Sequence, residues 1–179
     1  MPKHIAFLRA INVGGRTVKM DRLREIFESM GFDNAETFIA SGNAIFESKS
    51  KDEDTLVKKI EKGLNESLGF DVATFIRSNS ELAAIANHKP FPQPKMDSAS
   101  ALNVAFLSKP LDAKSKKLVM PLQTEIDDFH FHGREVYWIC LKKQSESKFS
   151  NVVFEQTLGV KSTFRGMNTV RKLADKFAA

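Results

Sequence analysis

The alternation of apolar and polar residues predicts a β-α-β-β-α-β order in the first half of the chain. Residues 3–9 form an apolar strand pattern, and the next apolar residues recur at helical spacings of three and four: Met20, Leu23, Ile26, Phe27 and Met30. Strands are predicted at residues 35–40, 43–48 and 71–77. A second helix has its apolar stripe before Gly69, a residue typical of helix ends.

The same order repeats after residues 89–100, which hold three of the six prolines and are predicted to be a linker. A short helix precedes this linker and stops before Pro90. We then expect a strand at 101–107, a helix at 112–122, a hairpin at 125–141, a helix at 149–159, a strand at 160–165 and a helix at 168–177. The pattern predicts an α+β fold with two tandem ferredoxin-like halves, residues 1–88 and 101–179, the second carrying the C-terminal helix.

This topology predicts where sequence-distant turns meet. A ferredoxin-like half has the strand order 4-1-3-2, so the chain leaves strand one, strand two and helix two at the same edge of the sheet. Residues 12–19, residues 41–43 and Gly69 are therefore expected to converge there as one rim.

The central strands are predicted to be buried on both faces. In the first strand, Ile5 and Phe7 face one way, and Ala6 and Leu8 the other. Residues 136–141 are also a continuous apolar run, which is typical of strands covered on both sides.

Composition and charge indicate which partners and which surroundings suit this protein. The 179 residues carry a net charge of +5 with a pI of about 9.3, which permits an anionic partner without requiring one. The single cysteine cannot form an internal disulfide, and no apolar stretch approaches the ~20 residues that cross a bilayer. We expect a soluble cytoplasmic protein that needs no cofactor.

The loop after the first strand has the composition of an anion cradle. Asn12, Gly14, Gly15, Arg16 and Lys19 fall between a strand and a helix. Consecutive glycines let backbone N–H groups approach an anion, and the following helix directs its positive end to the same place. A tight turn would need the same glycines, and neither established phosphate-loop motif is present.

The second turn of the rim, Ser41-Gly42-Asn43, is explained by a hairpin, because glycine and asparagine tolerate a positive φ. A nucleophilic Ser41 would need a base, and no histidine is expected nearby. We therefore expect this turn to form hydrogen bonds toward the glycine loop.

His130 and His132 flank Phe131 in the second predicted hairpin and offer two ligand nitrogens. A zinc site needs three or four ligands, and Asp127 or Asp128 would have to supply another. We favour a surface turn and predict no metal site.

The motifs together resemble the bacterial domain-of-unknown-function family 1697. Its pattern is approximately LLRGINVGG, K-M-x-x-L, Y-x-x-SGN-V-x-F and a closing T-x-R-N-W-x-T-x-x-K-L. This chain has FLRAINVGG, VKMDRL, FIASGNAIF and TFRGMNTVRKL in that order. It departs from the pattern at Ala10, at Phe38 and at the pair Gly166-Met167. The resemblance implies an α+β fold with ferredoxin-like elements but no established activity.

The sequence therefore predicts a binding module for an anionic ligand: a nucleotide, a phosphorylated metabolite or a nucleic-acid backbone. The candidate ligand-binding residues combine the rim with positions that match the family pattern: Arg9, Asn12, Gly14, Gly15, Arg16, Lys19, Ser41, Gly42, Asn43, Arg165 and Asn168. For Arg165 we favour a structural role.

Two alternatives stay open at this point. One is a small enzyme acting on a phosphorylated substrate at the same rim, and the other is a ligand-free domain that forms a homodimer. An RNA-recognition module is a poor match, since the third strand, GNAIFES, has one aromatic residue and no basic residue.

Overall fold

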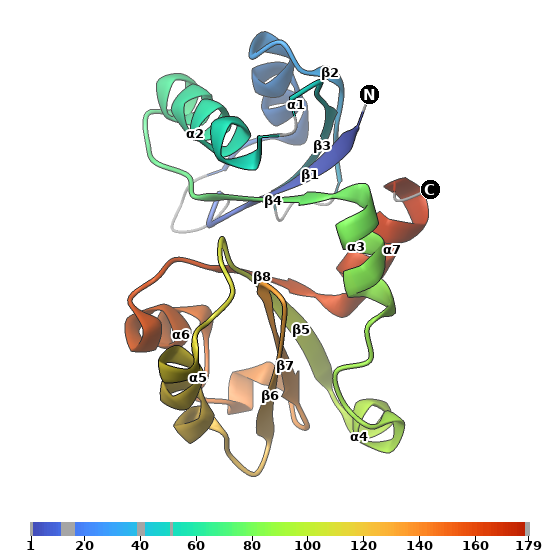
Figure 1. Cartoon of the computed structure of the whole chain (residues 1–179), viewed down its shortest axis with the longest axis vertical. Coiled ribbons are helices and arrows are strands. Elements are labelled where there is room, and N and C mark those ends of the chain that lie inside the picture. Colours follow the sequence, from blue (N-terminus) through green and yellow to red (C-terminus); the bar gives the residue numbers. More distant parts are fainter. Residues whose placement is uncertain (1, 12–16, 39–41, 51, 178–179) are drawn as a thin grey trace. The chain divides into compact units, whose positions relative to one another are not determined.

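The computed structural model describes residues 2–11, 17–38, 42–50 and 52–177 (Figure 1). The first eight elements are β1 (Lys3–Leu8), α1 (Met20–Ser29), β2 (Asp33–Thr37), β3 (Asn43–Glu47), α2 (Glu53–Leu68), β4 (Thr74–Ser78), α3 (Asn79–Asn87) and α4 (Gln93–Ser98). They are followed by β5 (Ala101–Phe106), α5 (Ala113–Val119), β6 (Asp127–His132), β7 (Glu135–Cys140), α6 (Asn151–Leu158), β8 (Thr163–Gly166) and α7 (Met167–Phe177). The chain divides into two compact units, residues 1–86 with 171–179, and residues 87–170.

The first unit is an antiparallel sheet in the order β2-β3-β1-β4, with α1 and α2 on one face (Figure 1). Apolar residues of both helices pack against alternate residues of the strands: Ala6, Leu8, Leu23, Ile26, Phe27, Phe46, Leu56, Ile60, Leu64 and Ile76. Ile5 and Phe7 are also completely buried, on the opposite face of β1. The predicted burial of this strand on both faces is confirmed.

The second unit repeats this arrangement. Its antiparallel sheet has the order β6-β7-β5-β8, and α5 and α6 cover one face (Figure 1). The core beneath these helices includes Leu107, Val119, Trp138, Phe149 and Phe154. Both sheets have the strand order 4-1-3-2 when numbered within each unit, so the predicted α+β architecture with two β-α-β-β-α-β halves and a C-terminal helix is confirmed.

Local signals in the sequence set several helix ends. The side chains of Asp52 and Asp112 accept hydrogen bonds from backbone N–H groups in the first turns of α2 and α5, as expected for N-caps. Gly69 and Gly159 follow α2 and α6 in the left-handed conformation, with φ of 82° and 70°. A residue with a side chain is strained at such angles, which explains why glycine occupies both ends.

The structure differs from the predicted elements at several boundaries. The proline-rich stretch 89–100, predicted as a linker, contains α4. The helix tolerates Pro94 because this proline lies in the first turn, where a missing N–H costs no hydrogen bond. Pro121 shortens α5, which ends at Val119 and continues as a 3₁₀ turn at Met120–Leu122. The last helix begins at Met167, one residue before the predicted start.

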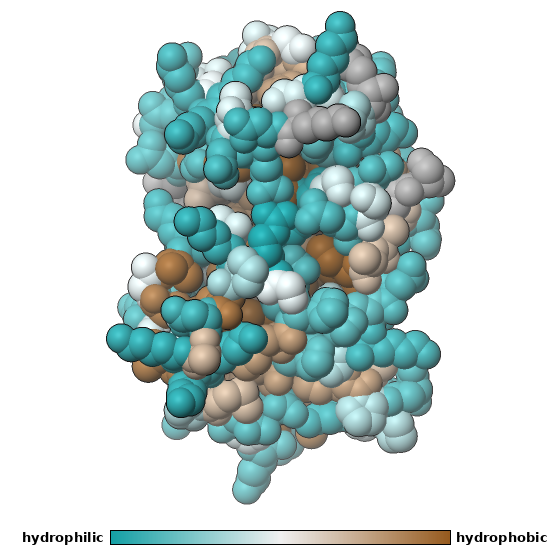
Figure 2. Space-filling model, in the orientation of Figure 1, coloured by the Kyte–Doolittle hydropathy of each residue, from teal (hydrophilic) through white to brown (hydrophobic). Residues whose placement is uncertain are grey.

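The visible surface is largely hydrophilic (Figure 2). Hydrophobic residues gather on the side of α5 and α6, and the most exposed large apolar residues lie on or beside these helices: Leu118, Met120, Val152 and Val160. Among the described residues, no helix has the length and apolar character needed to cross a membrane.

Candidate functional site

Three segments of the first unit meet at the end of its sheet where the rim is predicted: the end of β1, Gly42 before β3 and Ala73 before β4. The backbone N–H of Leu8 donates to the carbonyl oxygen of Gly42 at 2.9 Å. The N–H of Arg9 donates to the carbonyl oxygen of Ala73, also at 2.9 Å. These two bonds bring Gly42, a residue of the predicted rim, and Ala73 to the end of β1, although each bonded pair is more than thirty residues apart in the chain.

Gly42 allows these segments to pack closely. Its φ is +88°, and a Cβ atom at this position would lie 2.6 Å from Cγ2 of Ile11 and 3.3 Å from Cβ of Leu8. Any side chain would collide with Ile11 and crowd Leu8. The absence of a side chain at Gly42 thus allows its backbone to lie against Leu8 and Ile11.

Asn43 is completely buried, and its side-chain Nδ2 donates to the carbonyl oxygen of Phe38 at 2.8 Å. The backbone N–H of Phe38 donates in return to the carbonyl oxygen of Asn43 at 3.1 Å. These two bonds close the hairpin, so the amide of Asn43 acts within the turn.

Two of the basic residues among the predicted site residues are described, Arg9 and Lys19. Arg9 is half-buried after β1, and Lys19 is exposed at the N-cap of α1, where its side chain makes no capping hydrogen bond. Predicted site residues Asn12, Gly14, Gly15, Arg16 and Ser41 lie outside the described residues.

Arg165 and Asn168 belong to the second unit. Arg165 is buried, and its Nη1 donates to Oγ1 of Thr163 at 2.7 Å and to the carbonyl oxygen of Phe164 at 2.9 Å. Burial lowers the pKa of this guanidinium to about 10, so it stays charged at neutral pH. Asn168 is exposed on α7. The contacts of Arg165 fit the structural role that we favoured from the sequence.

The first unit contains the equivalent of Arg165. Arg77 of β4 is buried, and its Nη1 donates to the carbonyl oxygen of the preceding residue, Ile76, at 2.9 Å. Arg77 pairs with Ile5 of β1, and Arg165 pairs with Val104 of β5. The two halves therefore place a buried arginine at the same point of the fourth strand.

Three histidines come together on the second unit. His130 and His132 lie on the face of β6 opposite Phe129 and Phe131, which pack under α5 and α6. The Nε2 atoms of His88 and His130 are 3.0 Å apart, and the His88 ring stacks on His132 with centroids 3.9 Å apart. One ligand nitrogen from each of the three rings lies within 4.8 Å of the others.

The sequence pointed to two of these histidines but not to the third. His88 follows α3 and is 42 positions from His130, so no local spacing connects them. The aspartates considered as further ligands are engaged elsewhere. Asp127 accepts hydrogen bonds from Nε1 of Trp138 and from Ser147, and Asp128 is paired with Lys95. The third nitrogen comes from the chain segment before α4.

Burial is the main cause of lowered pKa values in this cluster. It lowers the pKa of His88, with further contributions from the charges of His132 and His130. It also lowers the pKa of His130, with a smaller contribution from His132 and an opposing one from Asp128. Both rings therefore favour the neutral form, which has a lone pair to offer.

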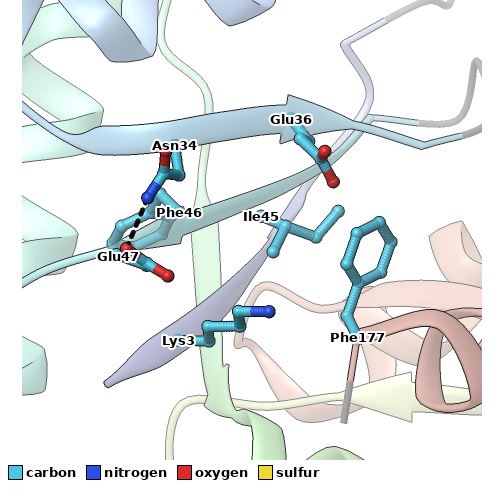
Figure 3. A pocket seen from close by; sticks show the side chains of 7 residues that line it. All are labelled: Lys3, Asn34, Glu36, Ile45, Phe46, Glu47 and Phe177. Carbon is cyan, nitrogen blue, oxygen red and sulfur yellow. Dashed lines mark hydrogen bonds between the residues drawn. The ribbon is translucent and has the colours of Figure 1, made fainter. Parts of the chain in front are cut away.

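A pocket of about 280 Å³ opens elsewhere on the first unit (Figure 3). Its side chains are Lys3, Asn34, Glu36, Ile45, Phe46, Glu47 and Phe177, and none is a predicted site residue. Asn34 donates to Glu47 at 2.7 Å, and the lining mixes one ammonium group with two carboxylates. The mixture of charges gives the pocket no clear preference for an anion.

The motifs at the rim and the fold agree with one family. The family model described as Protein of unknown function (DUF1697) matches residues 1–137. The chain belongs to this family. The DUF1697 match includes both turns of the rim and all three histidines, whereas the closing motif around Arg165 lies beyond the matched residues.

A solved structure shares the fold of this DUF1697 protein. It is that of a conserved bacterial protein from Streptococcus pneumoniae, with a TM-score of 0.79 and 23% sequence identity, covering 100% of this chain and 99% of the other. At this identity the likeness establishes the fold alone. A search of functionally curated proteins finds no match to this sequence.

Proposed function

We propose that this DUF1697 protein is a binding module for a phosphate-bearing anion, held at the rim of the first unit. The ligand class is a nucleotide, a phosphorylated metabolite or a nucleic-acid backbone. The observation that carries the proposal is the hydrogen bond from Leu8 to Gly42, which joins the two motif-bearing segments directly. This bond brings the end of β1 to Gly42, which supports a binding site shared by the two segments.

Electrostatics supports an anion at this place. The first backbone N–H groups of a helix have no intrahelical partners and carry partial positive charge. The N-cap residue of α1 is Lys19, whose side chain makes no capping hydrogen bond to them. Asp21 in the same turn is paired with Arg24 at 3.7 Å, which partly offsets its negative charge.

Packing and hydrogen bonds hold the described part of the rim. Ile11 is buried against Gly42, and Arg9 is anchored through its backbone to Ala73. A loop that begins at a fixed point loses less conformational freedom when it binds a ligand. This favours binding by the Asn12–Arg16 segment, which directly follows Ile11 in the sequence.

The proposal is tested by thermal denaturation with ATP, inorganic pyrophosphate or a mixed-sequence single-stranded oligonucleotide, at low and raised salt. A ligand at ~100 times its dissociation constant stabilises the fold by about 2.7 kcal/mol. Stabilisation by ATP or pyrophosphate that persists in salt identifies a small-molecule site. Stabilisation by the oligonucleotide alone, fading with salt, identifies a nucleic-acid backbone as the ligand.

Charge reversal locates the site. The double variant Arg16→Glu and Lys19→Glu is expected to abolish the stabilisation. The matched control is Lys58→Glu and Lys62→Glu, which changes the net charge equally at exposed positions of α2. Equal loss in both variants would mean that net charge alone matters, and no stabilisation of the wild type by any of the three probes would refute the proposal.

A further inference from the structure

We infer that His88, His130 and His132 bind one divalent late transition metal ion, with Zn²⁺ as the representative ion. This site belongs to the second unit and is independent of the anion site proposed above. Three imidazole nitrogens converge there. The fourth histidine of the chain, His4, belongs to the first unit. Imidazole is a ligand preferred by zinc, copper and nickel, whereas Mg²⁺ and Ca²⁺ prefer oxygen.

The distances suit a shared ion. With a Zn–N bond of ~2.0–2.1 Å, two nitrogens on a tetrahedral ion lie about 3.3 Å apart. The Nε2 atoms of His88 and His130 are 3.0 Å apart, and the nitrogen of His132 lies within 4.8 Å of both. His132 is exposed, so it is able to turn out of its stack with His88 and direct its lone pair to the ion.

Neighbouring contacts hold His88 over β6 before any ion arrives. The ring of Phe91 packs edge-on against His130 with centroids 6.1 Å apart, and Nζ of Lys95 pairs with Oδ2 of Asp128 at 2.5 Å. Both contacts attach the segment that follows His88 to the strand that carries the other two ligands. A site assembled in advance binds more tightly, because less chain must be ordered on binding.

The ligand set leaves a coordination position open. Three protein ligands do not complete a tetrahedral zinc site, and the exposed side of His132 allows a water molecule or an anion to complete it. Among the residues that the structure describes, no carboxylate joins the cluster, and Asp128 is engaged by Lys95 and by Gln123. We therefore assign a site with three imidazoles and one exchangeable ligand.

The test is isothermal titration of tag-free protein with ZnCl₂, with MgCl₂ as the negative control. We expect one Zn²⁺ per chain and no response to Mg²⁺. Co²⁺ should bind at the same site and give the visible absorption of a four- or five-coordinate ion. Because changes outside the ligand set already reduce metal affinity ~10–100-fold, His88→Ala and His132→Ala are each expected to weaken Zn²⁺ binding at least ~100-fold.

His4→Gln is the matched control, because it removes a histidine outside the cluster and should leave Zn²⁺ affinity unchanged. His132 is exposed, so its replacement should preserve the fold, which circular dichroism verifies. Absence of Zn²⁺ binding to the wild type would overturn the assignment. Unchanged affinity in His88→Ala and His132→Ala would overturn it equally, since the ion would then be bound elsewhere.

Discussion

Replacing Gly42 by alanine is expected to destabilise the protein more than the same replacement at Gly69. Both glycines have a left-handed backbone, with φ of +88° and +82°. A Cβ atom at Gly69 would meet nothing within 4 Å, whereas one at Gly42 would lie 2.6 Å from Cγ2 of Ile11. The pair therefore separates backbone strain from steric overlap at the rim.

The magnitudes follow from these two terms. A left-handed alanine costs about 1–2 kcal/mol relative to glycine, and this is the whole effect expected at Gly69. At Gly42 the methyl group also presses on Ile11 and Leu8, both buried, and overpacking of this kind adds about 1–3 kcal/mol. Gly42→Ala should thus reduce the free energy of unfolding by roughly 2–5 kcal/mol.

Equilibrium urea denaturation of both variants measures the difference, and a double variant tests its origin. Ile11→Ala removes the overlapping Cγ2 atom and itself costs about 2–5 kcal/mol as a cavity. In that background, Gly42→Ala should cost less than it does in the wild type, because the clash is relieved. Equal costs for Gly42→Ala and Gly69→Ala, with no coupling to Ile11, would refute the close packing that we describe at the rim.

Three further predictions concern single buried groups. Burial lowers the pKa of His4 in the folded protein. As the pH drops below about 6.5, this histidine therefore takes up a proton in the unfolded chain but not in the folded one, and the free energy of unfolding decreases. Urea denaturation at about pH 7.5 and about pH 5.5 measures this loss in the free energy of unfolding. The loss should be smaller in His4→Phe than in the wild type, by up to about 1.4 kcal/mol per pH unit, and an equal loss in both proteins would contradict this origin. Asp127→Ala leaves the buried Nε1 of Trp138 without its partner at 2.9 Å, so the free energy of unfolding should decrease by about 1–3 kcal/mol. The fluorescence of this single tryptophan reports the unfolding, and an unchanged free energy would show that the bond contributes nothing. Cys140 is buried and its pKa is raised by burial, so Ellman's reagent should modify it only after unfolding, and rapid modification of the native protein would contradict its burial.

The sequence predicted the elements of the fold because the signals for them are local. Alternation fixed the two faces of β1, and single residues such as Asp52 and Gly69 marked the ends of α2. The proline-rich segment 89–100 was interpreted as a linker because composition does not distinguish an irregular segment from a helix with proline in its first turn. The segment contains α4, a helix that this interpretation did not predict.

The candidate sites show where local reasoning ends. Convergence at the rim followed from topology, and the bond from Leu8 to Gly42 agrees with it. His88 was missed because its approach to His130 depends on tertiary contacts of Phe91 and Lys95, which no spacing in the sequence reveals. The predicted boundary also separated these histidines, because it placed residue 88 in the first half, whereas the structure assigns His88 to the second unit.

The central claim, an anion site at the rim, is tested most directly by mapping amide chemical shifts during a titration with ATP or pyrophosphate. We predict that the changes concentrate on the residues around the start of α1 and on the β2–β3 turn, including Arg9, Lys19 and Gly42. Changes centred on the pocket beside Phe177, or no changes at ligand concentrations that saturate ordinary nucleotide sites, would contradict the account.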